Sequence, residues 1–447
     1  MCKTAFTTGV SALLLLLFLS VSPSTAEIKT FTITSDTRPM ILLEKFGFIH
    51  SGHVSISVSS VFVVASGGSL PDPSRLGFFL LSEESLLQVL TEIQQNPSFC
   101  VLDSRYTMHL FTFHELSPPP SASANHTYPV TIPNEYSLFF ANCAPETSVS
   151  MLVHTELYNL NRDASRNYLS SGHTNLPSLL FLFSFAYFSF LLAFYLRHVT
   201  KHSLHRIHLL MASLLLAKAL NLLCAAVAKH YVKLTGTPHG WDVLFFIFDF
   251  IHVVLLFTVI VLVGTRWTFL HPLSQERGNR ALVKVIPLQI LAKIASVVIH
   301  KTGPYTENWV ALNQVFLLLD FISCCVVFSL IFWSVRSIRE ITSKNEGEGD
   351  HMNLYYKFSL IKRFYLLVIG YLFFTRFGMF AFKTFLSSEY QWVSNLVEET
   401  ANLVFFIVVM FYVVGLVEND EYSVTVTVTA EEKEQVKELY ESTKLEL

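Results

Sequence analysis

The sequence contains few charged residues. Asp, Glu, Lys and Arg make up 15% of its 447 residues, whereas soluble domains carry about 25%. The sequence also has 40 Phe and a hydrophobic fraction of 52%, which argues against a purely soluble enzyme. Disorder is excluded for most of the chain, because disorder needs low hydrophobicity and high net charge. The formal net charge of −3 offers no electrostatic basis for binding nucleic acid.

Catalytic and metal-binding motifs are lacking as well. The sequence contains neither Gly-x-Ser-x-Gly nor a phosphate-binding Gly loop, and His114-Glu115 lacks the second His of a zinc protease motif. The six Cys are too few for a disulfide scaffold. We therefore predict no enzymatic activity, no cofactor and no metal site.

Residues 1–26 show the three consecutive regions of a cleaved signal peptide. Lys3 supplies the charged start, Ala12–Leu19 the apolar segment, and Ser24-Thr25-Ala26 the small residues at the cleavage site. The apolar segment is too short to cross the ~30 Å core of a bilayer. The residues that follow are therefore expected to enter the secretory lumen.

Residues 27–171 predict a luminal β-sandwich domain. Apolar and polar residues alternate in Ile28–Thr34, His53–Val64 and Ser148–Tyr158, and Tyr106–Phe113 and Tyr136–Asn142 are aromatic-rich runs of strand length. Strands at this spacing are typical of a small sandwich.

One helix interrupts this pattern. Ser82 is a suitable N-cap, and Asn96-Pro97 ends the helical pattern. The face that we expect to be apolar consists of Leu86, Leu87, Leu90 and Ile93.

Two further features of this domain fit a lumen. Asn125-His126-Thr127 is the only N-glycosylation sequon with an allowed middle residue, and it lies in a segment predicted to be a Pro/Ser-rich loop. Cys100 and Cys143 are the only two Cys of the domain, and an oxidising lumen allows them to pair. We therefore predict a glycan at Asn125 and a disulfide, with two buried free thiols as the alternative to the disulfide.

Residues 176–417 contain apolar stretches for seven transmembrane helices. They are Leu176–Leu196, Leu204–Ala228, Trp241–Gly264, Ala281–His300, Asn308–Ser334, Phe358–Phe382 and Trp392–Val417. With a luminal N-terminus, Lys and Arg gather at the cytosolic ends and loops, and only Lys229, Lys233, Lys301 and Lys383 lie at luminal ones. This distribution satisfies the positive-inside rule and makes the acidic segment 418–447 a cytosolic tail.

Several stretches of the helical part resemble the lung seven-transmembrane receptor family, also described as the Golgi-dynamics-domain (GOLD) seven-helix proteins. They are Ile207-His208-Leu209-Leu210-Met211-Ala212, Gly264-Thr265-Arg266-Trp267, Val285-Ile286-Pro287-Leu288-Gln289, Phe373-Phe374-Thr375-Arg376 and Glu398-Glu399-Thr400-Ala401-Asn402-Leu403-Val404-Phe405-Phe406. The chain looks most like the plant branch, whose members carry the label candidate G-protein-coupled receptor. The resemblance implies a GOLD-like luminal sandwich, residence in Golgi, trans-Golgi network or endosomal membranes, and a role in vesicular traffic.

The residues that rhodopsin-type receptors use to switch are not found in this sequence. The third span ends in Gly264-Thr265-Arg266-Trp267 rather than Asp-Arg-Tyr, and the seventh contains no Asn-Pro-x-x-Tyr. Coupling to a heterotrimeric G protein is therefore an alternative rather than the leading prediction.

Ionisable residues inside the spans are the candidate site. Each costs at least ~2.5 kcal/mol at the centre of a membrane helix, so it is a functional hypothesis by default. The set is Lys218, Asp249, His252, Lys293, Asp320, Arg376, Glu398 and Glu399. Depth along each helix pairs Lys218 with Asp320, Asp249 with Lys293, and Arg376 with Glu399. Structural ion pairs are the favoured interpretation, and a polar cavity open to the lumen is the functional one.

These features lead to a functional hypothesis with two alternatives. The leading one is a Golgi, trans-Golgi network or endosomal membrane protein that acts in traffic and binds membrane lipid, luminal cargo or a ligand protein, with trafficking adaptors on the cytosolic side. The first alternative is a G-protein-coupled receptor, at the plasma membrane or in endomembranes, and the second is a channel or transporter.

Overall fold

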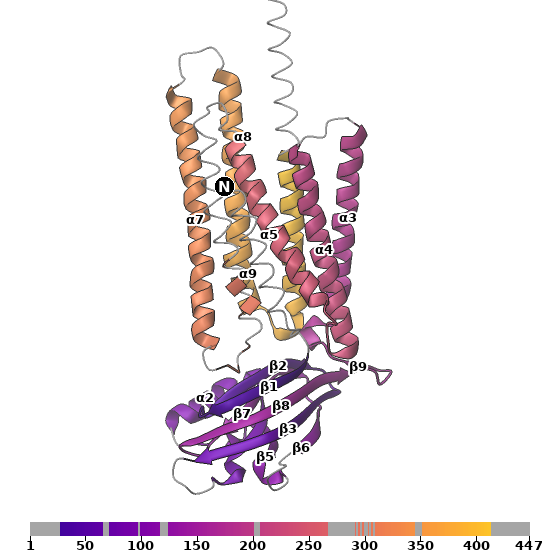
Figure 1. Cartoon of the computed structure of the whole chain (residues 1–447), viewed down its shortest axis with the longest axis vertical. Helices are drawn as coiled ribbons and strands as arrows, with labels where there is room; N and C mark the ends of the chain where they lie inside the picture. The colour runs from indigo at the N-terminus through magenta and orange to yellow at the C-terminus, as the bar shows by residue number, and fades with distance from the viewer. Residues whose placement is uncertain are drawn as a thin grey trace, which may run out of the picture.

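The chain folds into an antiparallel sandwich followed by a bundle of long helices, as the computed structural model shows (Figure 1). The structure describes residues 27–65, 71–96, 99–116, 124–200, 206–266, 309–344 and 351–412, with a few residues between 291 and 306. The predicted signal peptide and the predicted cytosolic tail lie outside the described residues. In Figure 1 the sandwich sits across one end of the bundle.

Two antiparallel sheets form the sandwich. Sheet A has the strand order β1-β8-β3-β6, with the short β9 pairing to β8, and sheet B has the order β2-β7-β4-β5. The strands are β1 Ile28–Asp36, β2 Met40–Phe48, β3 Gly52–Ala65, β4 Leu76–Ser82, β5 Thr107–Thr112, β6 Ala124–Val130, β7 Asn134–Asn142, β8 Thr147–Leu160 and β9 Arg166–Asn167.

The period-2 pattern of the sequence places one face of each sheet in a common core. Val54, Ile56 and Val58 of β3 are fully buried, while the serines between them are half-buried. Facing residues of sheet B, such as Phe78 and Phe140 with ring centroids 5.1 Å apart, complete this core. The predicted sandwich is therefore confirmed.

Sheet B is covered on its other face by α2, Leu86–Gln95. Ser82 caps the preceding 3-10 turn, where its side chain accepts a hydrogen bond from the Ser85 amide. The predicted apolar face of α2 is only partly right. Val89 is the buried residue, whereas Leu87 is 73% exposed, because the helix packs on sheet B through the side one residue away from the expected stripe.

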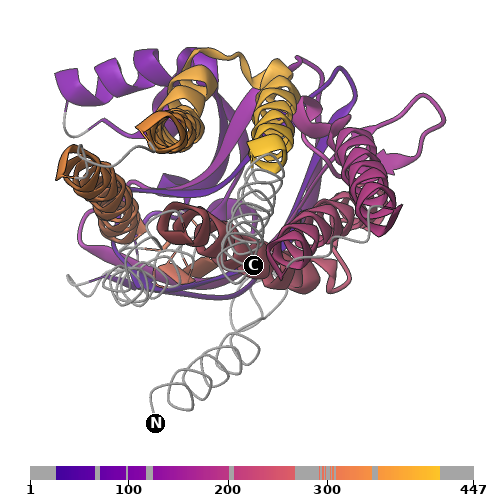
Figure 2. The same ribbon diagram turned by 90° about the horizontal axis from the view of Figure 1, so that it is seen from above.

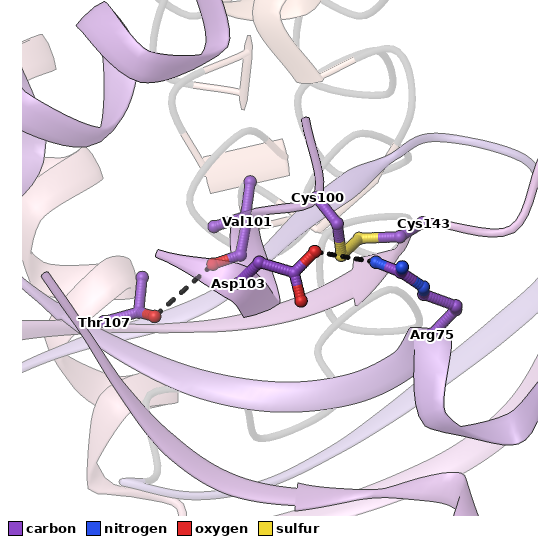
Figure 3. Close-up of a disulfide and its surroundings, with 6 residues drawn as sticks. All are labelled: Arg75, Cys100, Val101, Asp103, Thr107 and Cys143. Carbon is purple, nitrogen blue, oxygen red and sulfur yellow. Dashed lines mark hydrogen bonds and ion pairs between the residues drawn. A yellow bond between two sulfur atoms is a disulfide. The ribbon is translucent and has the colours of Figure 1, made fainter. Parts of the chain in front are cut away.

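The disulfide between Cys100 and Cys143 is present, which confirms the predicted pairing (Figure 3). It joins the segment after α2 to the end of β7. Next to it, Arg75 forms an exposed ion pair with Asp103 at 2.7 Å, and the Thr107 hydroxyl donates to the Val101 carbonyl at 3.4 Å. The bridge thus fixes the covering layer to sheet B.

The bundle contains long apolar helices at six of the seven predicted spans. They are α3 Leu176–Thr200, α4 Arg206–Thr235, α5 Trp241–Arg266, α7 Trp309–Lys344, α8 His351–Phe373, which continues through a π-turn into α9 Met379–Phe385, and the last helix, Gln391–Tyr412. Five helices of the described residues meet the length and hydropathy of a membrane span. The predicted fourth span lies mostly outside the described residues.

The apolar core of the bundle joins five of these helices. Tyr187 of α3, Leu215 of α4, Phe257 of α5, Phe364 of α8 and Phe406 of the last helix are all buried in it. Figure 2, seen along the bundle, shows the helices standing side by side above the sheets. Polar side chains inside this core therefore have little access to water.

Candidate functional site: a buried ion pair and the junction with the sandwich

The centre of the bundle holds an ion pair between α4 and the last helix. Lys218 Nζ lies 2.9 Å from Glu399 Oε1, and the two side chains are only 7% and 12% exposed. Removing two charges from water is costly, and the pair offsets that cost only through close contact. Lys218 and Glu399 therefore depend on each other, and they tie two helices that are far apart in sequence.

Polar and aromatic side chains surround this pair. The Tyr371 hydroxyl donates to Asn402 Oδ1 at 2.9 Å, and its ring stacks on Phe405 at 3.8 Å. Tyr187 is fully buried against Phe406. Within the described residues, the Tyr187 hydroxyl and Glu399 Oε2 are buried without a hydrogen-bond partner. Buried polar atoms normally have one, so these two atoms mark a place for a water molecule or a polar ligand group.

His252 borders the same centre from α5. Its ring lies edge-on to Phe406 with centroids 5.8 Å apart, and the residue is 7% exposed. Asp249 lies three residues earlier on α5 and is half-buried. The structure thus brings His252 close to the aromatic surroundings of Lys218 and Glu399.

The structure shows one ion pair that differs from the pairs expected from depth, whereas the pairings of Lys218 with Asp320 and of Asp249 with Lys293 stay predictions. Lys218 pairs with Glu399, a contact that depth along the helices does not predict. Their depths of ~16 and ~10 Å from the predicted luminal ends differ by about 6 Å, which the four-carbon stem of a lysine can span. The depth of a residue gives only its position along the helix axis. The rotation of each helix about that axis decides which side chains face each other. The side chain of Asp320, and Lys293 altogether, lie outside the described residues.

Glu398 points away from this centre. It pairs with Lys383 of α9 at 3.1 Å, and the side chains of Lys383 and Glu398 are 52% and 35% exposed. Consecutive residues of a helix point ~100° apart, so Glu398 and Glu399 reach different partners. Only Glu399 belongs to the buried centre.

Arg376 lies in the π-turn Phe374–Gly378 between α8 and α9. Such turns inside helices occur often at functional sites, and no pattern in the sequence indicated this one. The Thr375 hydroxyl within the turn donates to the Tyr371 carbonyl at 2.9 Å. The irregular backbone thus begins at Phe374, one helical turn after Tyr371, which bonds Asn402.

The sandwich is bonded to the end of α4. The amides of Glu27 and Ile28 donate to the Gly236 carbonyl at 2.9 and 3.4 Å, and the Tyr168 amide donates to the Lys233 carbonyl at 3.2 Å. Gly236 has φ +75°, and a Cβ there would lie 2.6 Å from Ile28. Glycine is therefore needed both to end the helix in the left-handed region and to admit the first strand.

A second contact joins the sandwich to the segment before α7. Arg38, held by Asp36 at 2.6 Å, donates to the Tyr305 carbonyl. The Tyr305 ring packs edge-on against Phe31 of β1 at 5.0 Å. With the α4 contact, the sandwich is attached at two separate places on the bundle.

Beside this junction the sandwich contains its own buried carboxylate. A β-bulge between Leu42 and Glu44 turns Glu44 into the core. Lys29 binds it at 2.5 Å, and the Thr155 hydroxyl donates to it at 3.3 Å. Burial raises the pKa of Glu44 to about 8, although Lys29 acts in the opposite direction. Attraction to Glu44 raises the pKa of Lys29 despite the opposing effect of its burial.

The described residues contain no group of three or more His, Cys, Asp or Glu that could hold a metal ion. The polar chemistry of the bundle is therefore that of paired charges, hydroxyls and amides. Such a set of side chains can bind a polar group and hold the helices in register. The junction can transmit a displacement of the sandwich to the bundle, or of the bundle to the sandwich.

The comparisons with known proteins agree with this architecture. The family model described as the N-terminal domain of CAND6/7 matches residues 29–159. The chain is 54% identical over 401 residues to the Arabidopsis thaliana protein candidate G-protein coupled receptor 6. The aligned region covers 89% of this chain and 92% of the Arabidopsis protein. The chain therefore belongs to the CAND6/7 family of candidate G-protein coupled receptors, the plant branch of the GOLD-domain seven-transmembrane proteins.

Proposed function

We propose that this protein acts in vesicular traffic as a multi-pass membrane protein of the Golgi, trans-Golgi network and endosomes. The observation that carries the proposal is the double attachment of the sandwich to the bundle, through Gly236 and through Tyr305. A recognition domain fixed to a membrane bundle can pass the binding of a luminal molecule to the cytosolic side. The disulfide Cys100–Cys143 supports a luminal sandwich, because disulfides persist in oxidising compartments.

In this proposal the two parts bind different partners. The sandwich recognises a luminal cargo or ligand protein, and the bundle takes a membrane lipid or another polar ligand near Tyr187 and Glu399. The two buried atoms without a hydrogen-bond partner support such a ligand, because a ligand group would satisfy them. Trafficking adaptors then act from the cytosolic side.

The experiment compares two glycine variants in cells that depend on a tagged copy of the full chain. Gly236→Ala disturbs the junction, whereas Gly240→Ala alters a positive-φ glycine that has nothing within 4 Å of its would-be Cβ. We expect the wild type and Gly240→Ala to reside in the Golgi and endosomes and to support normal transit of a secreted reporter. Gly236→Ala should slow that transit several-fold. Equal transit rates with both variants, or residence of the wild type at the plasma membrane, would contradict the proposal.

Signalling through a G protein is the second candidate, and it is favoured by the name of the Arabidopsis relative. It predicts that the purified full chain accelerates guanine-nucleotide exchange on a heterotrimeric G protein. If a saturating concentration of the purified chain leaves the rate of nucleotide exchange unchanged, the purified protein is not an active receptor.

A further inference from the structure

The outer face of sheet A, defined here as the side that points away from sheet B, carries almost no charge. Its side chains alternate along each strand with those of the core. They include Thr30, Thr32, Ser55, Ser57, Ser59, Phe62, Val64, Asn125, Thr127, Ser148, Ser150, Leu152, His154 and Glu156. Hydroxyl groups dominate, and Glu156, the only Asp, Glu, Lys or Arg among them, is bound by Arg166 at 2.6 Å. Apart from this one ion pair, the face is therefore polar and uncharged.

Large apolar side chains are exposed on this face, and Leu152 is one of them, at 36%. Phe62 and Val64 are 67% and 65% exposed. They follow a bulge in the pairing of β3 with β8, beyond which the alternation continues with Val61 and Val63 packed toward the core. Exposed apolar groups beside an uncharged sheet favour association with other chains.

Strand β6 forms the edge of sheet A beside this face. It pairs with β3 on one side only within the described residues. Natural proteins protect such edges with charges, Pro or a covering element, because an open edge is a template for another strand. Of these devices, β6 itself carries only Pro129.

The sequon lies on this edge. Asn125 is in β6, opposite Ser57, and not in a loop as the sequence had suggested. Its side chain is exposed on the outer face, next to Thr127, whose hydroxyl donates to Ser55 at 3.1 Å. A group attached to Asn125 would thus start at the open edge and meet a row of hydroxyls. Phe62 is five residues beyond Ser57, or about 16 Å along β3, which lies within reach of a branched core oligosaccharide.

We propose that an N-glycan on Asn125 closes the open edge of β6 and covers the outer face of sheet A as far as Phe62 and Val64. In the transfer step, Asn125 Nδ2 forms a bond to the anomeric carbon of a lipid-linked oligosaccharide. The bond from that carbon to the lipid diphosphate breaks, and the amide loses one proton. The proposal rests on a luminal sandwich, and protease protection of a C-terminal tag tests that placement separately.

The test uses the full chain expressed in a glycosylating eukaryotic host and purified in detergent. Five proteins are compared: the wild type, Asn125→Gln, and Asn125→Gln combined in turn with Ser55→Asn, with Asp163→Thr or with Phe62→Ser. Ser55→Asn creates a sequon with Ser57 on the neighbouring strand of the same face. Asp163→Thr creates one at Asn161, in the exposed turn between β8 and β9. Glycosidase band shifts report the glycan, and light scattering reports the association state.

We expect the wild type to shift with glycosidase and to be monodisperse. Asn125→Gln should lose the shift and form a several-fold larger fraction of oligomers, which Ser55→Asn should reduce and Asp163→Thr should not. Adding Phe62→Ser to Asn125→Gln should also reduce the oligomers. A wild type without a glycan, an Asn125→Gln protein as monodisperse as the wild type, or equal rescue by the glycan at Asn161 would overturn the proposal.

Discussion

The sandwich and the bundle each bury a Lys–Glu pair, but they bury it differently. In the sandwich the side chain of Glu44 is 1% exposed, while that of its partner Lys29 is 35% exposed. In the bundle the side chains of Lys218 and Glu399 are both nearly inaccessible, at 7% and 12%. One partner of the first pair keeps access to water, so the sandwich can tolerate a change of protonation. The bundle pair has no such access, and its two charges must be kept or lost together.

The largest effect expected in the sandwich comes from its disulfide. Cys100→Ser should lower the free energy of unfolding of the sandwich by about 2–5 kcal/mol, because the bridge restricts the unfolded chain. Thermal unfolding of the purified full chain measures this loss. Cys325→Ser, which removes an exposed free thiol from α7, should leave the transition unchanged. Equal melting of Cys100→Ser and the wild type would mean that the bridge contributes nothing.

The junction between the two parts should be the next most sensitive place. A non-glycine residue at positive φ costs ~1–2 kcal/mol, and both Gly236→Ala and Gly240→Ala incur this cost. Gly236→Ala must in addition displace Ile28, so a loss of about 2–3 kcal/mol is expected there. The comparison of the two melting temperatures isolates the contact with Ile28. Identical losses of stability in the two variants would show that Ile28 does not restrict the space at Gly236.

The pH dependence of the sandwich should differ from that of the bundle because of Glu44. Its folded pKa of about 8 lies above the ordinary 4.5, so the folded state holds a proton that the unfolded state has released between these values. The stabilisation is complete below pH 4.5 and is lost as the pH rises through 8. Lys29 titrates above this window, since its pKa is raised from 10.5.

Glu44→Gln tests this prediction, because glutamine has the size of glutamate but no carboxyl group that titrates. Denaturant unfolding between pH 5 and 6.5 should show a decline in the stability of the wild type of about 1–2 kcal/mol, and a flatter profile for Glu44→Gln. A wild type that becomes more stable over this range would reverse the sign and refute the assignment.

A smaller effect is expected from the hydrogen bond beside the bundle pair. Tyr371→Phe keeps the ring on Phe405 but removes the donor to Asn402. The loss should be about 1 kcal/mol, the usual contribution of one such bond. Phe405→Leu serves as a comparison that weakens the stacking and keeps the hydrogen bond. A Tyr371→Phe protein as stable as the wild type would mean that the hydroxyl and Asn402 are satisfied by other groups.

The sandwich was more predictable from the sequence than the bundle site. Strands β1, β3 and β8 have one buried face, so a strict alternation marks them in the sequence. By contrast, β4 reads Leu-Gly-Phe-Phe-Leu-Leu-Ser and is buried on both faces, between the core and α2. A strand without alternation leaves no periodic signal, so the sequence pattern does not predict β4.

The charged residues of the bundle are recognisable in the sequence, but the pairing of Lys218 with Glu399 is not. A charge inside an apolar run stands out in any sequence, which is how Lys218 and Glu399 were found. Their pairing depends on helix rotation and on the reach of a lysine, and neither is written in a single helix. The bulge that turns Glu44 inward and the π-turn at Arg376 are likewise products of packing.

A double-mutant cycle on the bundle pair, read by thermal melting of the full chain in detergent, measures directly whether Lys218 and Glu399 hold the helices together. Lys218→Met and Glu399→Gln should each destabilise the bundle strongly, and the double variant should be milder than the sum by more than about 1 kcal/mol, because no charge is left unpaired. Lys383→Met with Glu398→Gln, which removes the exposed pair, should give a smaller coupling. Additive losses for Lys218 and Glu399 would contradict the account, since they would mean that the two charges do not hold the helices together.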